Sequence, residues 1–236
     1  DDGRLGWQGT GISLAVAIEM LGDSPVGVRE AAEDEALAHD APAAAALPAV
    51  LASWWFTWED RLDEALRAAT RSIDYGGIHT WASWQRAYLV VALGGTVDGS
   101  ELEDLLRLSP SGTGYDGVVG PLALQALGET RRALAWSESA LSYTGVDGRV
   151  GYHEITMRVG AILRARVGDE ENAAILLGAA DATRERFGFP ARAHLDRLVA
   201  EDVAPALATL TPVERDAALR LGAATPRSEL AGLIAG

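Results

Sequence analysis

The chain lacks two residue types on which much protein chemistry depends. Its 236 residues include no cysteine, and all 20 basic residues are arginine, so lysine is absent as well. Thiol catalysis, disulfide bonds and cysteine-ligated zinc or iron–sulfur sites are therefore excluded. Schiff-base chemistry, a lysine general base and the lysine of a phosphate-binding loop are excluded for the same reason.

Positive charge is also scarce. Acidic residues outnumber basic ones by 34 to 20, which gives a formal net charge of -14. Because clustered Lys and Arg supply most of the affinity for phosphate backbones, we expect no direct binding of nucleic acid. The densest pairs of arginines are interpreted as solvated helix faces. These pairs are Arg131 with Arg132, Arg164 with Arg166, and Arg184 with Arg186.

Neither a signal peptide nor a membrane span is expected. No basic segment precedes an apolar run at the start of the chain. The uncharged stretch 41–58 is close to the lower length limit of a transmembrane helix, but Pro42 and Pro48 interrupt it and Asp40 and Glu59 flank it. We predict a buried helix there and a cytoplasmic protein without membrane contact.

The period of the apolar residues predicts an all-α chain. Apolar positions recur at helical spacing in nearly every long segment, and alternating β-branched runs are almost absent. A helix is expected to begin near Glu59 and Asp60, and another to begin after a capping box formed by Ser100 and Glu103. Glycines separate the helices. They are Gly94 with Gly95, Gly128, Gly145, Gly148 and Gly168. The other predicted helices span residues 78–93, 101–108, 118–127, 130–141, 152–167 and 170–187.

An internal repeat follows several of these turns. Mostly small residues recur at offsets of five, nine and twelve after Asp60, Gly128 and Gly168. They are Ala65, Ala69 and Ser72; Ala133, Ser137 and Ala140; and Ala173, Leu177 and Ala180. This pattern resembles the tetratricopeptide repeat, in which small side chains let the second helix pack on the first.

The predicted architecture is a tetratricopeptide-like α-solenoid of antiparallel helix pairs, with an irregular helical bundle as the alternative. A single domain over residues 1–236 is expected. Residues 1–40 would form N-terminal helices of uncertain repeat membership, 41–187 degenerate helix-pair repeats, and 188–236 C-terminal capping helices.

Two partial motifs for cofactor or metal binding occur, but neither lies in the sequence context that such a site requires. Residues 112–117 have the glycine spacing of a dinucleotide-binding loop but lie between predicted helices, where a linker is expected. His153 and Glu154 begin a zinc-protease motif whose second histidine is replaced by Met157. We therefore expect no cofactor and no metal site. An acidic run is interpreted as a solvated helix face; it comprises Glu30, Glu33, Asp34 and Glu35.

Aromatic residues are concentrated in one region and form the candidate binding site. Rings from two predicted helices could line an apolar pocket for a small effector, with indole N–H groups as its polar part. Core packing and a groove for a partner helix are the two other interpretations. The residues are Trp54, Trp55, Trp58, His79, Trp81, Trp84 and Tyr88.

The last part of the chain resembles a known family. Residues 173–188, AAILLGAADATRERFG, followed by Phe189 and Pro190 and by the tail AALRLGAATPRSELAGLI at 217–234, are similar to the C-terminal region of large actinobacterial transcriptional regulators. These are the regulators of the LuxR and antibiotic-regulatory-protein types, which carry a signal-transduction ATPase module. The resemblance is weaker before residue 173 and absent from 1–40.

The resemblance implies a regulatory role without catalysis. The chain would be the helical sensor or interaction region of such a regulator, binding a partner protein, other modules of the same full-length chain, or a small apolar effector. Two alternatives are an α-helical enzyme with a carboxylate-based site and a purely structural spacer.

Overall fold

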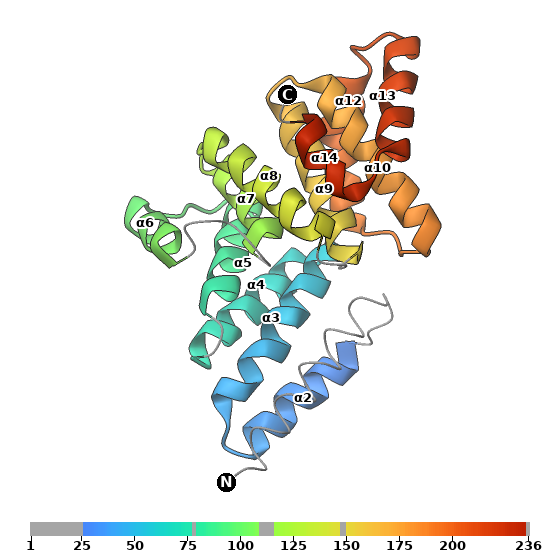
Figure 1. Cartoon of the computed structure of the whole chain (residues 1–236). Coiled ribbons are helices and arrows are strands. Elements are labelled where there is room, and N and C mark those ends of the chain that lie inside the picture. The colour runs from blue at the N-terminus through green and yellow to red at the C-terminus, as the bar shows by residue number, and fades with distance from the viewer. Residues whose placement is uncertain (1–25, 77–78, 109–115, 147–149, 235–236) are drawn as a thin grey trace. The chain divides into compact units, whose positions relative to one another are not determined.

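The described part of the chain is helical. The computed structural model describes residues 26–76, 79–108, 116–146 and 150–234, and no strand occurs among them. The chain divides into two compact units, residues 1–108 and 109–236, each of which is described by itself. Figure 1 labels the helices of both units.

The first unit contains α2 to α6, and each helix packs against the next from α2 to α6. Their bounds are Val26–Ala38 (α2), Pro42–Trp58 (α3), Leu62–Asp74 (α4), His79–Ala92 (α5) and Gly99–Leu108 (α6). The uncharged stretch 41–58 is thus confirmed as a buried helix, because twelve residues of α3 are buried.

Small side chains bring α3 and α4 close together. Buried alanines line the contact, and two buried serines donate hydrogen bonds across it to backbone carbonyls. Ser53 Oγ donates to the carbonyl oxygen of Ala65 at 2.7 Å, and Ser72 Oγ donates to that of Ala46 at 2.7 Å. Larger residues at these places would separate the helices, which agrees with the small residues predicted at 65, 69 and 72.

The helix ends follow a recurring turn. Asp60, Gly94, Gly128 and Gly168 all have a positive φ, and each is the second residue after the end of a helix. Left-handed residues of this kind end helices because they direct the following N–H groups back to the last carbonyls. The glycine turns predicted at Gly94, Gly128 and Gly168 are confirmed. The separator predicted at Gly145 is wrong, because the helix Thr130–Val146 continues through it, and Gly148 lies outside the described residues.

Two local predictions in the first unit are wrong. The capping box predicted from Ser100 and Glu103 is wrong: α6 begins at Gly99, before Ser100, and the carboxylate of Asp98 accepts from the backbone N–H of Glu101 at 2.8 Å. The acidic run is solvated at Asp34 and Glu35 only; Glu33 is buried. The side chain of Glu30 lies outside the described residues.

The second unit is built around α9. This helix packs against α7, α8, α10 and the π-helical turn η1, and thirteen of its residues are buried. The bounds are Asp116–Ala126 (α7), Thr130–Val146 (α8), Val150–Arg166 (α9), Glu170–Phe187 (α10), Ala193–Leu198 (α11), Val199–Val203 (η1), Ala204–Leu207 (α12), Pro212–Ala224 (α13) and Arg227–Ile234 (α14). The helix predicted over 170–187 is confirmed with the same bounds as α10.

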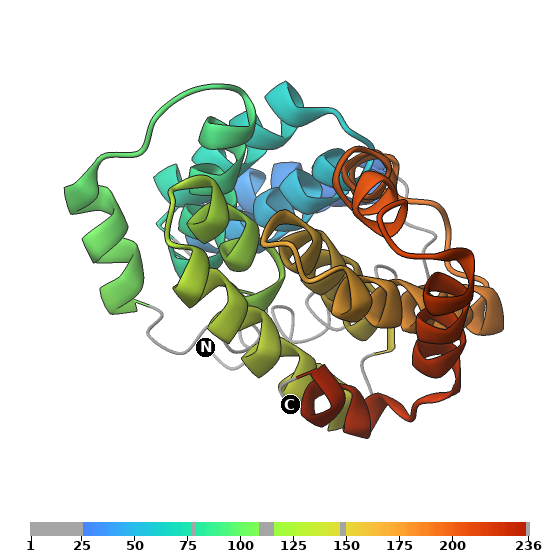
Figure 2. The same ribbon diagram turned by 90° about the horizontal axis from the view of Figure 1, so that it is seen from above.

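The C-terminal helices fold back on the second unit. Figure 2 shows α13 along α10 and α14 beside the end of α8. Two glycines allow the close approach of α10 and α13: a Cβ built on Gly178 would lie 2.1 Å from the carbonyl oxygen of Leu219, and one on Gly222 would lie 1.8 Å from that of Ile175. The α10–α13 contact is therefore backbone against backbone.

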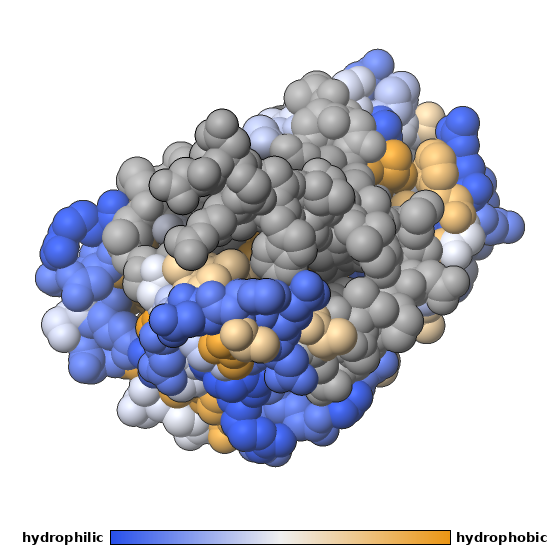
Figure 3. All heavy atoms as spheres, turned by 90° about the horizontal axis from the view of Figure 1, so that it is seen from below, coloured by the Kyte–Doolittle hydropathy of each residue, from blue (hydrophilic) through white to orange (hydrophobic). Residues whose placement is uncertain are grey.

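The hydropathy of the described helices and of the surface was compared with that of membrane-spanning segments. No described helix is long and apolar enough to cross a membrane. On the face drawn in Figure 3 most of the coloured surface is hydrophilic, with small hydrophobic areas between.

Candidate functional site

Most of the predicted aromatic site lies in the core of the first unit. Trp84 has no exposed surface, Trp54 is 3% exposed, and Trp58 and Tyr88 are buried as well. Burial of this degree is typical of rings that fill the space between helices. These four side chains therefore stabilise the unit by packing.

The structure brings the two predicted tryptophan faces together. The rings of Trp54 on α3 and Trp81 on α5 have centroids 6.1 Å apart at an interplanar angle of 33°. Trp55 and Trp81 keep part of their surface exposed. His79 is the first residue of α5, and its side chain lies outside the described residues. Trp55 and Trp81 are therefore the described tryptophans of the predicted site that solvent reaches.

Polar groups lie beneath the aromatic region. Gln85, which is fully buried, donates from Nε2 to Thr57 Oγ1 at 2.6 Å, and Thr57 in turn donates to the carbonyl oxygen of Ser53 at 2.9 Å. On the outside, the Arg61 guanidinium stacks 4.4 Å from the centroid of the Phe56 ring. The hydrogen bond between Gln85 and Thr57 therefore ties α5 to α3.

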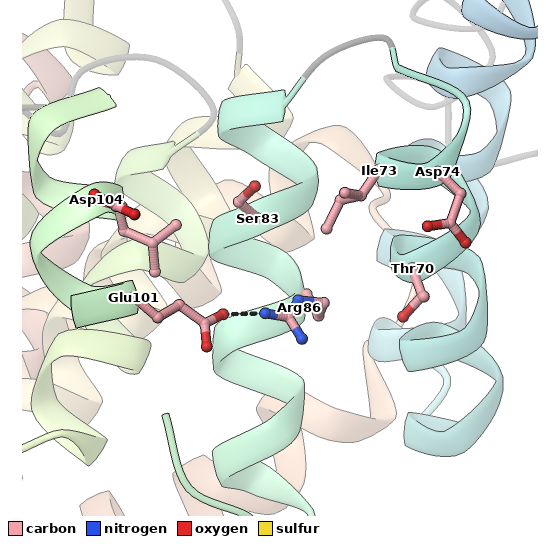
Figure 4. A pocket seen from close by; sticks show the side chains of 8 residues that line it. Thr70, Ile73, Asp74, Ser83, Arg86, Glu101 and Asp104 are labelled. Atoms are coloured by element: carbon pink, nitrogen blue, oxygen red, sulfur yellow. Dashed lines mark hydrogen bonds and ion pairs between the residues drawn. The ribbon is translucent and has the colours of Figure 1, made fainter. Parts of the chain in front are cut away.

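A cleft between α4, α5 and α6 was not predicted. It has a volume of about 310 Å³ and combines charged, hydroxyl and apolar side chains (Figure 4). The lining residues are Thr70, Ile73, Asp74, Ser83, Arg86, Glu101, Asp104 and Leu105. Figure 4 shows Arg86 of α5 and Glu101 of α6 pointing toward one another, and the two form an ion pair. No sequence signal could have found this cleft, because the three helices meet only through tertiary packing.

A polar cluster in the first unit joins Glu33 of α2 to the C-terminal end of α4. Arg71 donates from Nε to one carboxylate oxygen of Glu33 at 2.8 Å and from Nη2 to the other at 3.2 Å. The hydroxyl of Tyr75 donates to Glu33 at 2.9 Å. Glu33 raises the pKa of Arg71, whereas burial followed by the hydrogen bond to Glu33 raises that of Tyr75. Glu33 is thus a buried structural carboxylate.

The second unit contains a larger buried charge cluster. Glu154, with no exposed surface, lies among three arginines, Arg158, Arg184 and Arg192. Arg158 also pairs with Asp181 at 2.6 Å. Three further contacts complete the cluster: Arg184 to Glu154 at 3.1 Å, Arg184 to Asp196 at 2.9 Å, and the backbone N–H of Arg192 to Asp196 at 3.1 Å.

The cluster is balanced in charge. Its three arginines face three carboxylates, so burial of Glu154 is compensated. Burial opposes the charge on Arg158, but Glu154, followed by Asp181 and Asp196, raises its pKa. Because α9, α10 and the start of α11 each supply charges, the cluster joins three elements of the unit.

These contacts correct the interpretation of two arginine pairs. Arg184 and Arg164 are not solvated: their side chains are 19% and 14% exposed, and Arg164 pairs with Glu138 and with Asp169 at 2.8 Å. Arg131 and Arg132 are exposed, as predicted. Helical sequence context does not reveal a partner on another helix, so the buried arginines could not be distinguished from solvated ones.

The histidine of the incomplete zinc motif has a structural environment. His153 is buried, and its Nδ1 lies 2.8 Å from Thr144 Oγ1, which is 3.1 Å from Thr156 Oγ1. Within the described ranges no group of three or more His, Asp or Glu side chains is placed to hold a metal ion. The sequence 109–115, which includes most of the glycine-rich motif, lies outside the described residues.

The comparisons with known proteins leave the family open. No protein-family model, curated protein or solved structure matches the chain.

Proposed function

We propose that the chain is a tetratricopeptide-like helical-repeat module with a regulatory, non-enzymatic role. In this proposal the module belongs to a larger transcriptional regulator of the LuxR or antibiotic-regulatory-protein type and binds a partner protein or a small effector. The recurring turn geometry is the observation that carries the proposal.

The spacing of these turns supports a repeat. Asp60, Gly94 and Gly128, all with positive φ, follow one another at intervals of 34 residues, which is the length of a tetratricopeptide repeat. Asp40, Gly76 and Gly188 also have a positive φ at helix ends and fall outside this spacing. Gly168 follows after a longer interval of 40 residues. In a helical pair, such a residue ends the first helix and starts the return of the chain along it.

The residues after the turns support the same interpretation. Ala65, Ala133 and Ala173 each stand five residues after a left-handed residue, and none has exposed surface. The N–H of each bonds the carbonyl oxygen of the residue four before it at 2.9–3.0 Å. The turn at Gly94 departs from the pattern, because Gly99 stands at the fifth position and begins α6.

Repeated helix pairs favour binding over catalysis. Stacked pairs present extended surfaces on which partners dock, and their cores hold few groups for chemistry. Three buried charged side chains, Glu33, Glu154 and Arg158, form ion pairs with residues of other helices. The part of the aromatic region open to solvent, Trp55 and Trp81, is our candidate contact for the ligand.

A thermal-shift screen with small apolar compounds tests the effector form of the proposal. A compound present at about 100 times its dissociation constant stabilises a protein by about 2.7 kcal/mol, a readily measured rise in Tm. We expect the rise in the natural chain and not in Trp81→Ala, with the compound recovered chemically unchanged.

Phe187→Ala is a matched control, because Phe187 is an exposed ring in the second unit. The control should keep the full rise in Tm. Chemical conversion of a compound by the chain would contradict the non-enzymatic role, and an equal response of both variants would remove Trp81 from the site.

A further inference from the structure

Helix α6 is held to the first unit by few interactions. Among its described side chains Leu105 alone is buried, at 3% exposed, whereas Leu102 and Leu106 are partly exposed. The helix has ten residues, and helices of this length are marginal in water without packing. Among the described side chains of α6, Leu105 is therefore the main anchor of the helix on the first unit.

The second contact of α6 is the ion pair between Glu101 and Arg86. Both side chains are about one-third exposed. An ion pair with this much solvent exposure adds little stability, because solvent screens the charges and both side chains lose conformational freedom. The connection from α5, residues 93–98, is exposed except at Val97, so few contacts hold it in place.

Departure of α6 would change the chemistry of the cleft. Glu101, Asp104 and Leu105 would leave with the helix, whereas Arg86, Ser83 and Ile73 remain on α4 and α5. When α6 is docked, the Glu101 carboxylate forms an ion pair with the Arg86 guanidinium, as Figure 4 shows. In the open form this guanidinium would be available to another carboxylate or anionic group.

We propose that α6 is a strap that opens as a unit and uncovers Arg86. The inference goes beyond the proposed function, because it concerns a motion of the first unit that holds whether or not an effector binds at Trp81. Arg86 is the group that the strap protects, and Glu101 is its internal competitor.

Hydrogen exchange of the whole chain, read by mass spectrometry, tests the strap. We expect the α6 amides to exchange at least about a hundredfold faster than the α5 amides, because they open without global unfolding. Leu105→Ala should raise α6 exchange at least about thirtyfold and leave α3 to α5 unchanged.

The matched control is Leu51→Ala, which removes an equally buried leucine from α3. It should raise exchange throughout the first unit. Exchange in α6 as slow as in α5, or a general rise in Leu105→Ala like that in Leu51→Ala, would overturn the proposal.

Two further measurements test the role of Arg86: hydrogen exchange in Arg86 variants and chemical modification of its side chain. Arg86→Gln should speed α6 exchange about two- to fivefold, and Arg86→Lys should restore most of the protection. Phenylglyoxal should modify Arg86 faster in Leu105→Ala than in the natural chain, with exposed Arg67 as the internal reference. An unchanged rate at Arg86 would show that the strap does not cover it.

Discussion

At the scale of single residues, the second unit depends on charges that are buried together. Glu154 has no exposed surface, and three guanidinium groups surround it. A buried ion is costly unless partners compensate it, so removing one partner leaves the others uncompensated. The cluster therefore restricts this part of the unit to one arrangement of α9, α10 and α11.

Glu154→Gln tests this dependence. We expect a loss of roughly 3–5 kcal/mol in the free energy of unfolding, because the substitution removes one charge from a balanced buried cluster. Urea denaturation followed by circular dichroism measures the loss. Glu185→Gln on the exposed side of α10 is the control and should change stability little; equal effects of the two variants would refute the structural role of the cluster.

The glycines of the α10–α13 contact give a second test at this scale. Gly178→Ala should destabilise the second unit by roughly 3 kcal/mol or more, because its Cβ would overlap a backbone oxygen that cannot move independently. Gly232→Ala in α14 is the control, since nothing lies within 4 Å of the added atom. Equal stability of these two variants in urea titrations would contradict the close crossing of α10 and α13.

At the scale of helices and turns, several features follow from local chemistry. Thr211 and Glu214 form a capping box at the start of α13: Thr211 Oγ1 accepts from the N–H of Glu214 at 3.3 Å, and the Glu214 carboxylate accepts from the N–H of Thr211 at 2.9 Å. Hydrogen bonds from the Thr211 side chain and backbone lower the pKa of Glu214. Such a cap needs only residues three apart, so it forms within the helix itself.

The lowered pKa predicts a pH dependence of α13. A depressed carboxyl pKa contributes stability that is present above the ordinary glutamate value and is lost as pH falls through the folded value. In a carboxyl NMR titration Glu214 should titrate below the ordinary glutamate value, and Thr211→Ala should return it toward that value. An unshifted Glu214 in the natural chain would contradict the capping box.

The same distinction between local and distant contacts explains what the sequence could predict. The helix over 170–187 and the turns at Gly94, Gly128 and Gly168 were predictable, because periodicity and left-handed glycines act within a few residues. The pairing of Glu33 with Arg71 was not, since 38 residues separate the two.

The candidate site follows the same rule. The aromatic residues were found by composition, but which of them are buried depends on the register between α3 and α5. The cleft with Arg86 and Glu101 depends on the docking of α6, for which the sequence holds no signal.

At the scale of the whole molecule, the chain consists of two compact helical units with related turns. The first carries the aromatic region and the α4–α5–α6 cleft, and the second carries the buried charge cluster and the C-terminal helices. Under the proposed function, a ligand that prefers one arrangement of these helices would shift the population toward it.

A native mass spectrum of the purified chain tests the central claim, a regulatory binding module, most directly. The account predicts species heavier than the 24.8 kDa chain, from a retained small molecule or a bound protein, that are lost in Trp81→Ala and kept in Phe187→Ala. A bare monomer for the natural chain, expressed together with the proteins of its source cell, would contradict the account and favour a structural spacer.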